Sequence, residues 1–155
     1  MRSAIALLLL LAALIEGNAC PFCRESVITL QTVYETEHFR VLIDFEPRVP
    51  GHLLAVTKRH IAMIDEMTQE EWTDLHQVVP RIANAFAQLL DTDQYVVLEK
   101  NGKKAFQDIS HVHIHFFPIH DEKWGDVFDI IPRRLTPEEI DAEVSAFKEH
   151  FLCTG

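Results

Sequence analysis

The sequence predicts an α+β fold with an antiparallel sheet, and two observations carry that prediction. Five short segments have the β-branched, aromatic and alternating apolar composition of strands. Two other segments begin with helix start signals and continue with apolar residues at helical spacing. Short strands separated by turns, with helices grouped elsewhere in the chain, favour antiparallel pairing.

The strands are expected at 27–34, 38–45, 53–56, 95–98 and 110–117. In the second segment, Phe39, Val41, Ile43 and Phe45 alternate along the chain, as a strand with one buried face requires. The Pro and Gly residues of 47–51 predict a turn before the third strand. Pro118 ends the fifth strand.

The main helix is expected to start at a capping box, Thr68-Gln69-Glu70-Glu71, and to end before Asp91. Pro80 lies inside it and is expected to kink or split it. A last helix should open at Thr136-Pro137, with proline at its first position. Residues 119–135 have no regular pattern.

Composition indicates one globular domain after a short leader. The chain has 155 residues, 48% hydrophobic and 25% charged, with a formal net charge of −10. Such a negative surface repels phosphate backbones, so a nucleic-acid partner is not expected. Residues 1–19 combine Arg2, an apolar run over 4–15 and small residues before Cys20, which is typical of a signal peptide.

The leader leaves several localisations open. If it is a signal, the protein is exported or membrane-associated, and the only expected membrane contact is through an uncleaved leader. If it is an appended hydrophobic helix, or if the start codon has been assigned too early, the protein is cytoplasmic.

Three histidines, His111, His113 and His115, alternate with apolar residues in the fifth predicted strand. On a strand they would share one face, while Val112 and Ile114 would point into a core. Imidazole titrates near neutrality and can attack phosphorus, transfer protons or bind metal. Three of them on one face therefore indicate a functional site.

This run resembles the signature of the histidine triad (HIT) family, His-x-His-x-His followed by two apolar residues. Further motifs occur in that family's order and cover residues 20–118: Cys20-Pro21-Phe22-Cys23, Asp44-Phe45-Glu46-Pro47, Pro50-Gly51-His52, Lys58-Arg59-His60-Ile61, Asn101-Gly102 and Gln107. The resemblance implies a HIT domain over 20–118, with residues 119–155 as a C-terminal extension that contains a helix.

The resemblance also implies a fold, an assembly and an activity. The HIT-like fold has a five-stranded antiparallel sheet with a main helix, here joined by a C-terminal helix, and forms a homodimer through sheets joined side by side. The activity would be hydrolysis of dinucleoside polyphosphates or nucleoside phosphoramidates through a covalent nucleotidyl-histidine intermediate. A non-catalytic zinc-binding or nucleotide-sensing module is the alternative, and turnover distinguishes the two.

By the same resemblance, His113 is the nucleophile, His115 contacts the phosphate oxygens and His52 joins the cluster. Asp44 would bind the ribose hydroxyls, although an Asp at a strand end is also an ordinary surface residue. Gln107 and Asn101 complete the expected nucleotide-binding set. The sequence departs from the family at Lys100, where an Asn is usual, and at Phe106, where a Gly is usual.

The zinc-containing branch of the family implies a structural zinc site formed by Cys20, Cys23, His60 and His111. Cys₂His₂ is a common composition of structural zinc sites. A redox-active dithiol is the alternative for the two cysteines. The remaining histidines match no family motif and are expected at the surface: His38, His76, His120 and His150.

Overall fold

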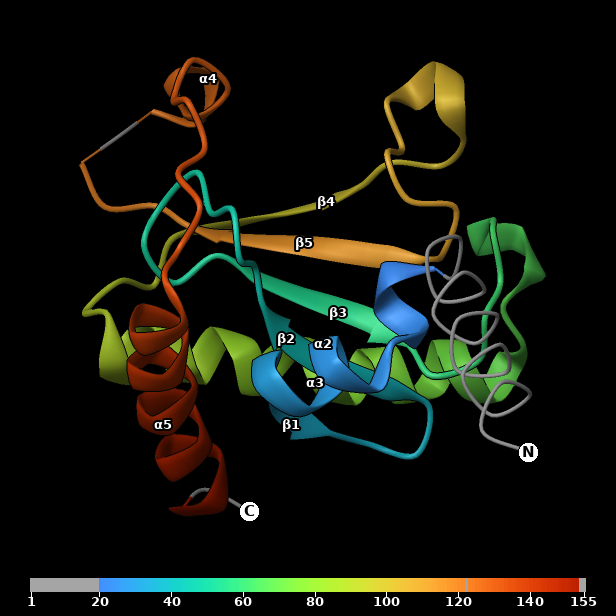
Figure 1. The fold of residues 1–155 in the computed structure, drawn as a ribbon, viewed down its shortest axis with the longest axis horizontal. Coiled ribbons are helices and arrows are strands. Elements are labelled where there is room, and N and C mark those ends of the chain that lie inside the picture. The colour runs from blue at the N-terminus through green and yellow to red at the C-terminus, as the bar shows by residue number, and fades with distance from the viewer. Residues whose placement is uncertain (1–19, 122, 154–155) are drawn as a thin grey trace, which may run out of the picture.

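The computed structural model describes residues 20–121 and 123–153 (Figure 1). The predicted leader, 1–19, lies outside the described residues. Within the described part of the chain, no helix is both long and apolar enough to cross a membrane.

The predicted antiparallel sheet is confirmed. Its strands are β1 (Thr32–Glu35), β2 (Phe39–Ile43), β3 (Leu53–Thr57), β4 (Tyr95–Glu99) and β5 (His113–Pro118). They lie in the order β1-β2-β3-β5-β4, and each neighbouring pair is antiparallel. The triad strand β5 therefore lies inside the sheet, between β3 and β4.

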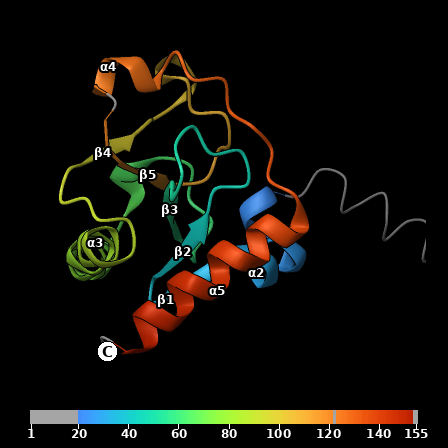
Figure 2. The same ribbon diagram turned by 90° about the vertical axis from the view of Figure 1, so that its left-hand side faces the viewer.

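The two faces of the sheet have different roles. Helix α3 (Gln69–Leu89) and helix α5 (Pro137–Cys153) share one core with the sheet, formed by residues such as Val41, Phe86 and Phe147. On β5, Ile114 and Phe116 belong to that core. Figures 1 and 2 show how α3 and α5 lie against the sheet. Because side chains alternate along a strand, His113 and His115 are left on the opposite face.

The first predicted strand is wrong over most of its length. Residues Glu25–Gln31 form helix α2, which follows a short 3-10 turn, η1 (Pro21–Cys23), and only Thr32–Glu35 joins the sheet. Helix α2 packs against α5 (Figure 2). The Thr32 hydroxyl donates to the Ile28 carbonyl at 2.6 Å and satisfies the helix end. Tertiary packing here overrides the β propensity of Val27, Ile28 and Thr29.

The main helix is not split at Pro80, because α3 continues from Gln69 to Leu89. Pro80 and His76 are both exposed, so water can solvate the His76 carbonyl that Pro80 cannot bond. The capping box is confirmed, since Glu71 N donates to Thr68 Oγ1 at 3.3 Å and Thr68 N donates to Glu71 Oε2 at 2.8 Å.

Two further predictions need correction. Strand β5 begins at His113, so His111 precedes the strand instead of lying on it. His150 is buried, not on the surface, because it lies on the same packed end of α5 as Phe147 and Phe151. Residues 119–135, for which no element was predicted, contain the short helix α4 (Trp124–Val127).

Candidate functional site

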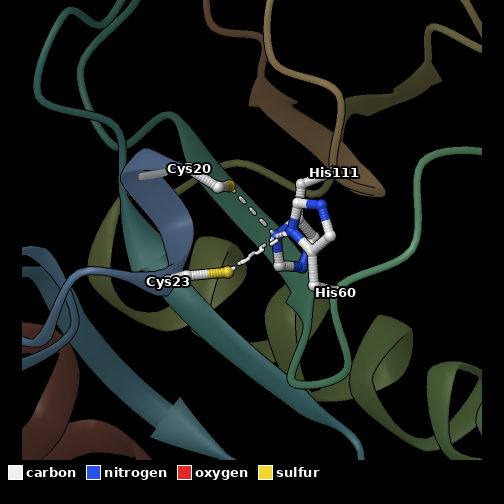
Figure 3. Close-up of side chains that lie close together, drawn as sticks. All are labelled: Cys20, Cys23, His60 and His111. Atoms are coloured by element: carbon white, nitrogen blue, oxygen red, sulfur yellow. Dashed lines mark hydrogen bonds between the residues drawn. The ribbon is translucent and has the colours of Figure 1, made fainter. Parts of the chain in front are cut away.

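Four side chains converge beside the start of β5, and they are the predicted metal ligands (Figure 3). His111 Nδ1 lies 3.3 Å from Cys20 Sγ, 3.6 Å from Cys23 Sγ and 3.2 Å from His60 Nδ1. Cys23 Sγ and His60 Nδ1 are 3.4 Å apart. A tetrahedral zinc ion with bonds of about 2.0–2.3 Å separates its ligand atoms by about 3.3–3.8 Å. The residues therefore fit a metal ion of this size and geometry.

The other nitrogen of the His111 ring supports the same interpretation. Nε2 lies 2.7 Å from the Thr57 carbonyl oxygen, which can only accept, so the ring proton is on Nε2. Nδ1 then carries a lone pair directed at the other three ligand atoms. A carbonyl that fixes the tautomer of a ligand histidine is typical of metal sites.

The backbone of His111 positions the next histidine. His113 Nδ1 lies 2.6 Å from the His111 carbonyl oxygen and must donate to it. The other ring nitrogen, Nε2, then carries the lone pair, and the His113 side chain lines a pocket. Burial lowers the pKa of His113 below its ordinary value, which favours the neutral ring at neutral pH. A neutral, oriented imidazole is suited to nucleophilic attack.

His115, His52 and Asp44 form a second chain of polar contacts. His52 Nε2 and His115 Nδ1 are 3.0 Å apart. His52 Nδ1 lies 3.1 Å from Asp44 Oδ2, but not at a hydrogen-bonding angle, so the two groups are in contact without a hydrogen bond. Within the described residues, the buried His115 Nε2 has no partner. That nitrogen is therefore available to a bound ligand.

Burial shifts the pKa of every member of this chain towards its neutral form. The pKa of His115 falls to about 3, and that of His52 falls well below its usual value. The pKa of Asp44 rises. Desolvation is the largest cause in all three cases, because each side chain is largely buried. A charged ligand would interact strongly with the site.

The histidines line a pocket of about 780 Å³, which is large enough for a nucleotide-sized ligand. The ring of Phe22 lies 5.0 Å from that of His113. Other apolar side chains complete the lining, among them Phe45, Ile109, Phe128 and Pro132. In Figure 1 the loop that contains η3 (Lys103–Ala105) and the segment around α4 stand at opposite ends of β5. Both contribute to the lining.

Asn101 and Gln107 do not belong to this lining. Gln107 Oε1 accepts from Gly102 N at 2.8 Å, and Gln107 Nε2 donates to the Ala62 carbonyl at 2.9 Å. Asn101 Oδ1 accepts from Ile64 N at 2.8 Å. Both side chains therefore tie the loop beside the pocket to the backbone of the segment that contains Ala62 and Ile64, and Gln107 also bonds to the loop's own backbone at Gly102.

The two departures from the family pattern lie at the pocket. Lys100 and Phe106 both line it. Phe106 has φ +61° and is 78% exposed, so a bulky side chain occupies a left-handed conformation that glycine adopts without strain. The loop therefore has a backbone conformation at position 106 that suits glycine, although the residue there is Phe.

Sequence reasoning missed Arg48, which lines the pocket and ties two segments together. Its Nη1 donates to the carbonyl oxygens of Phe128 and Ile130 at 3.1 and 2.6 Å. These bonds tie the 128–132 segment to Arg48, and Phe128 and Pro132 of the same segment also line the pocket. No local pattern links positions 80 residues apart, so no sequence signal indicated this contact.

Known proteins resemble this chain over the same region. The HIT domain family matches residues 25–122. The adenosine 5'-monophosphoramidase of Saccharomyces cerevisiae is 37% identical over 109 residues, which cover 69% of this chain and 66% of that protein. The bis(5'-adenosyl)-triphosphatase of Dictyostelium discoideum is 30% identical over 124 residues, covering 76% and 83%.

A solved structure shows the same fold over nearly the whole chain. A zinc-bound histidine triad family protein from Mycobacterium smegmatis aligns with a TM-score of 0.64 and covers 94% of each chain at 22% identity. The family match, the sequence relatives and the fold agree. The chain therefore belongs to the HIT family, and it groups with relatives that are hydrolases.

Proposed function

We propose that this protein hydrolyses nucleotide conjugates at the α-phosphorus through a nucleotidyl-His113 intermediate. One observation carries the proposal: the 2.6 Å contact between His113 Nδ1 and the His111 carbonyl, which leaves the Nε2 lone pair on a side chain that lines the pocket. The names of the two hydrolase relatives support the substrate classes, nucleoside phosphoramidates and dinucleoside polyphosphates.

The reaction would proceed in two displacements at phosphorus. His113 Nε2 attacks, a P–N bond forms, and the bond to the leaving group breaks with its electrons on that group. The ring becomes cationic, and the His111 carbonyl stabilises it through the Nδ1 proton. Water then attacks the same phosphorus, the P–N bond breaks with its electrons on Nε2, and nucleoside monophosphate leaves with the neutral ring restored. The proton that the water loses to solvent balances the proton that an amine leaving group takes up in the first displacement.

His115 would stabilise the charge that develops on the phosphate oxygens. It does so as a donor at Nε2, which requires His52 Nε2–H to donate to His115 Nδ1 across their 3.0 Å contact. In this arrangement His52 is a positioning residue, because it fixes the proton on the correct nitrogen of His115.

Asp44 would accept hydrogen bonds from the ribose hydroxyls. It lines the pocket, and its Oδ1 already accepts from Glu46 N at 2.9 Å, which holds the carboxylate in place. Asn101 and Gln107 would assist nucleotide binding indirectly, by bracing the loop that contains Phe106.

Zinc would occupy the site of Cys20, Cys23, His60 and His111. The supporting observations are the tetrahedral spacing of the four ligand atoms and the fixed Nε2 proton of His111. Bound zinc would hold the N-terminal segment to the chain just before β5. It would take no part in the displacement at phosphorus, because its ligand set is complete.

We also infer a homodimer formed through β4. This strand is at the edge of the sheet, and Val97 on it is 45% exposed. The opposite edge, β1, is covered by α5, where the rings of Tyr34 and Phe151 stack at 4.9 Å. Pairing of two β4 strands would satisfy the free backbone groups of that edge. Sedimentation of the wild type and of Val97→Lys tests this, since only the wild type should be dimeric.

The deciding experiment measures hydrolysis of adenosine 5'-phosphoramidate and diadenosine triphosphate by the full chain. His113→Ala should lower kcat by about a thousandfold or more, while AMP binding persists, because the lost group forms the covalent bond. His76→Ala, an exposed histidine on α3, is the control and should keep full activity. A near-normal rate in His113→Ala would refute the covalent mechanism. A wild type that binds zinc and AMP but hydrolyses neither substrate would favour the non-catalytic module.

A further inference from the structure

Lys100 is placed beside the proposed nucleophile by strand register. Glu99, the last residue of β4, pairs with Ile114 of β5. Since the strands are antiparallel, Lys100 comes next to His113. The Lys100 side chain is only 25% exposed and lines the pocket.

Lys100 has hydrogen-bond donors to offer, whereas the other basic residue of the pocket lining is engaged. Arg48 Nη1 is bonded to the carbonyls of Phe128 and Ile130. Lys100 Nζ lies 3.8 Å from Asp108 Oδ2, which is too long for a hydrogen bond, and the Asp108 side chain is 86% exposed. This loose, solvated ion pair costs little to rearrange.

The charge of Lys100 acts across the whole pocket. Its positive charge opposes the rise in the pKa of Asp44 and adds to the fall in the pKa of His52, His113 and His115. Burial is the larger influence on each of the four pKa values. An ammonium group that acts on four residues of the pocket would also act on a bound anion.

Lys100 and Asp44 lie at opposite ends of the pocket. Asp44 follows Ile43, which pairs with Leu53, and Leu53 in turn pairs with Phe116 near the far end of β5. Lys100 is at the His113 end. A nucleoside held by Asp44 would therefore direct its phosphate chain past His113 towards Lys100.

We propose that Lys100 binds the phosphate next to the α-phosphorus on the leaving-group side, and so makes the site favour nucleotides with a polyphosphate chain over phosphoramidates. This rests on the proposed function and specifies its substrate class. The chemistry is a charge-assisted hydrogen bond to an anionic oxygen. A phosphoramidate that releases ammonia has no second phosphate to occupy that position.

The test compares Lys100→Gln, Lys100→Arg and the control Lys103→Gln with the wild type. Lys103 is exposed and lies outside the pocket lining. Its replacement by Gln changes the net charge by the same amount as Lys100→Gln. Lys100→Gln should lower kcat/KM for diadenosine triphosphate by about tenfold, and that for adenosine 5'-phosphoramidate by less than about twofold. Lys100→Arg and Lys103→Gln should keep the wild-type ratio of the two values.

Binding of ADP and AMP separates this inference from the proposed function. ADP has the additional phosphate and AMP lacks it, so Lys100→Gln should reduce the ADP preference by about tenfold. If no substrate is hydrolysed but the preference for ADP depends on Lys100, the inference about Lys100 is supported and the proposed hydrolytic activity is refuted. The inference would be overturned, with hydrolysis left intact, if Lys100→Gln and Lys103→Gln had equal effects on two ratios: that of the kcat/KM values for the two substrates, and that of the affinities for ADP and AMP. A wild type that binds neither nucleotide overturns both.

Discussion

The four-residue cluster around His111 and the pocket around His113 both use imidazole side chains, but in two different arrangements, although His111 and His113 are only two residues apart. In the cluster, two imidazole nitrogens and two sulfurs face one another, and the contacts between them measure 3.2–3.6 Å. In the pocket, the imidazoles follow one another in a chain, His52 Nε2 to His115 Nδ1 at 3.0 Å, and His115 Nε2 has no partner among the described residues.

The difference shows how imidazole function depends on where the ring protons are held. His111 and His113 each give one proton to a backbone carbonyl, but from opposite ring nitrogens, Nε2 and Nδ1 respectively. Each ring is thereby left with a lone pair on a different side. Backbone geometry thus directs the free lone pair of His111 towards the Cys20, Cys23 and His60 side chains, and that of His113 away from the carbonyl that holds its other nitrogen.

Removing one metal ligand should produce the largest change. Cys23→Ser should lower the zinc content from about one ion per chain to near zero, because a three-ligand site with a poor fourth ligand binds weakly. Activity should fall by about a hundredfold, because loss of the metal would loosen His111, whose carbonyl orients His113. Elemental analysis and kcat measure the two effects. Cys153→Ser, an exposed cysteine in α5, is the control. Equal zinc in both variants would remove Cys23 from the site.

Breaking the histidine chain should have a smaller effect and leave the metal in place. His52→Gln should lower kcat by about ten- to a hundredfold, because His115 loses the imidazole that fixes its proton. Zinc content should equal that of the wild type. Loss of zinc in His52→Gln would show that the two regions are not separable in the way their contacts indicate.

Acid should affect the pocket through its histidines. Burial lowers the pKa of His113, so the neutral nucleophile persists below the ordinary pKa of about 6.5. As pH falls through the lowered value, His113 takes up a proton and kcat/KM should drop by about tenfold per unit. A pH–rate profile with its acid midpoint below 6.5 is expected, and a midpoint above 6.5 would contradict the burial argument.

The smallest change is expected at the edge of the pocket. Phe106→Gly should raise the free energy of unfolding by about 1 kcal/mol, because glycine adopts φ +61° without strain. Phe128→Gly is the matched control, since Phe128 also lines the pocket and is exposed but has φ −72°. Urea unfolding measures both. If Phe106→Gly were instead less stable than the wild type, the contacts of the Phe106 ring would stabilise the fold by more than the backbone strain at φ +61° destabilises it.

Local patterns were sufficient for much of the fold and for the residue types of the site. The alternation of His113, Ile114 and His115 predicts opposite faces of β5, and that is observed. The capping box at Thr68 predicts the start of α3. Such signals lie within a few residues of one another, so the backbone conformation they specify does not depend on the rest of the chain.

Tertiary packing decided what no local pattern contains. Residues 25–31 became α2 because that segment packs against α5, against its own β propensity. Gln107 bonds to the backbone of its own loop and of Ala62, and Arg48 reaches carbonyls about 80 positions away. Sequence alone determined that histidines and cysteines were available for chemistry. Only the folded chain brought Cys20 within 3.3 Å of His111, because the approach of residues 91 positions apart is fixed by the sheet and its core.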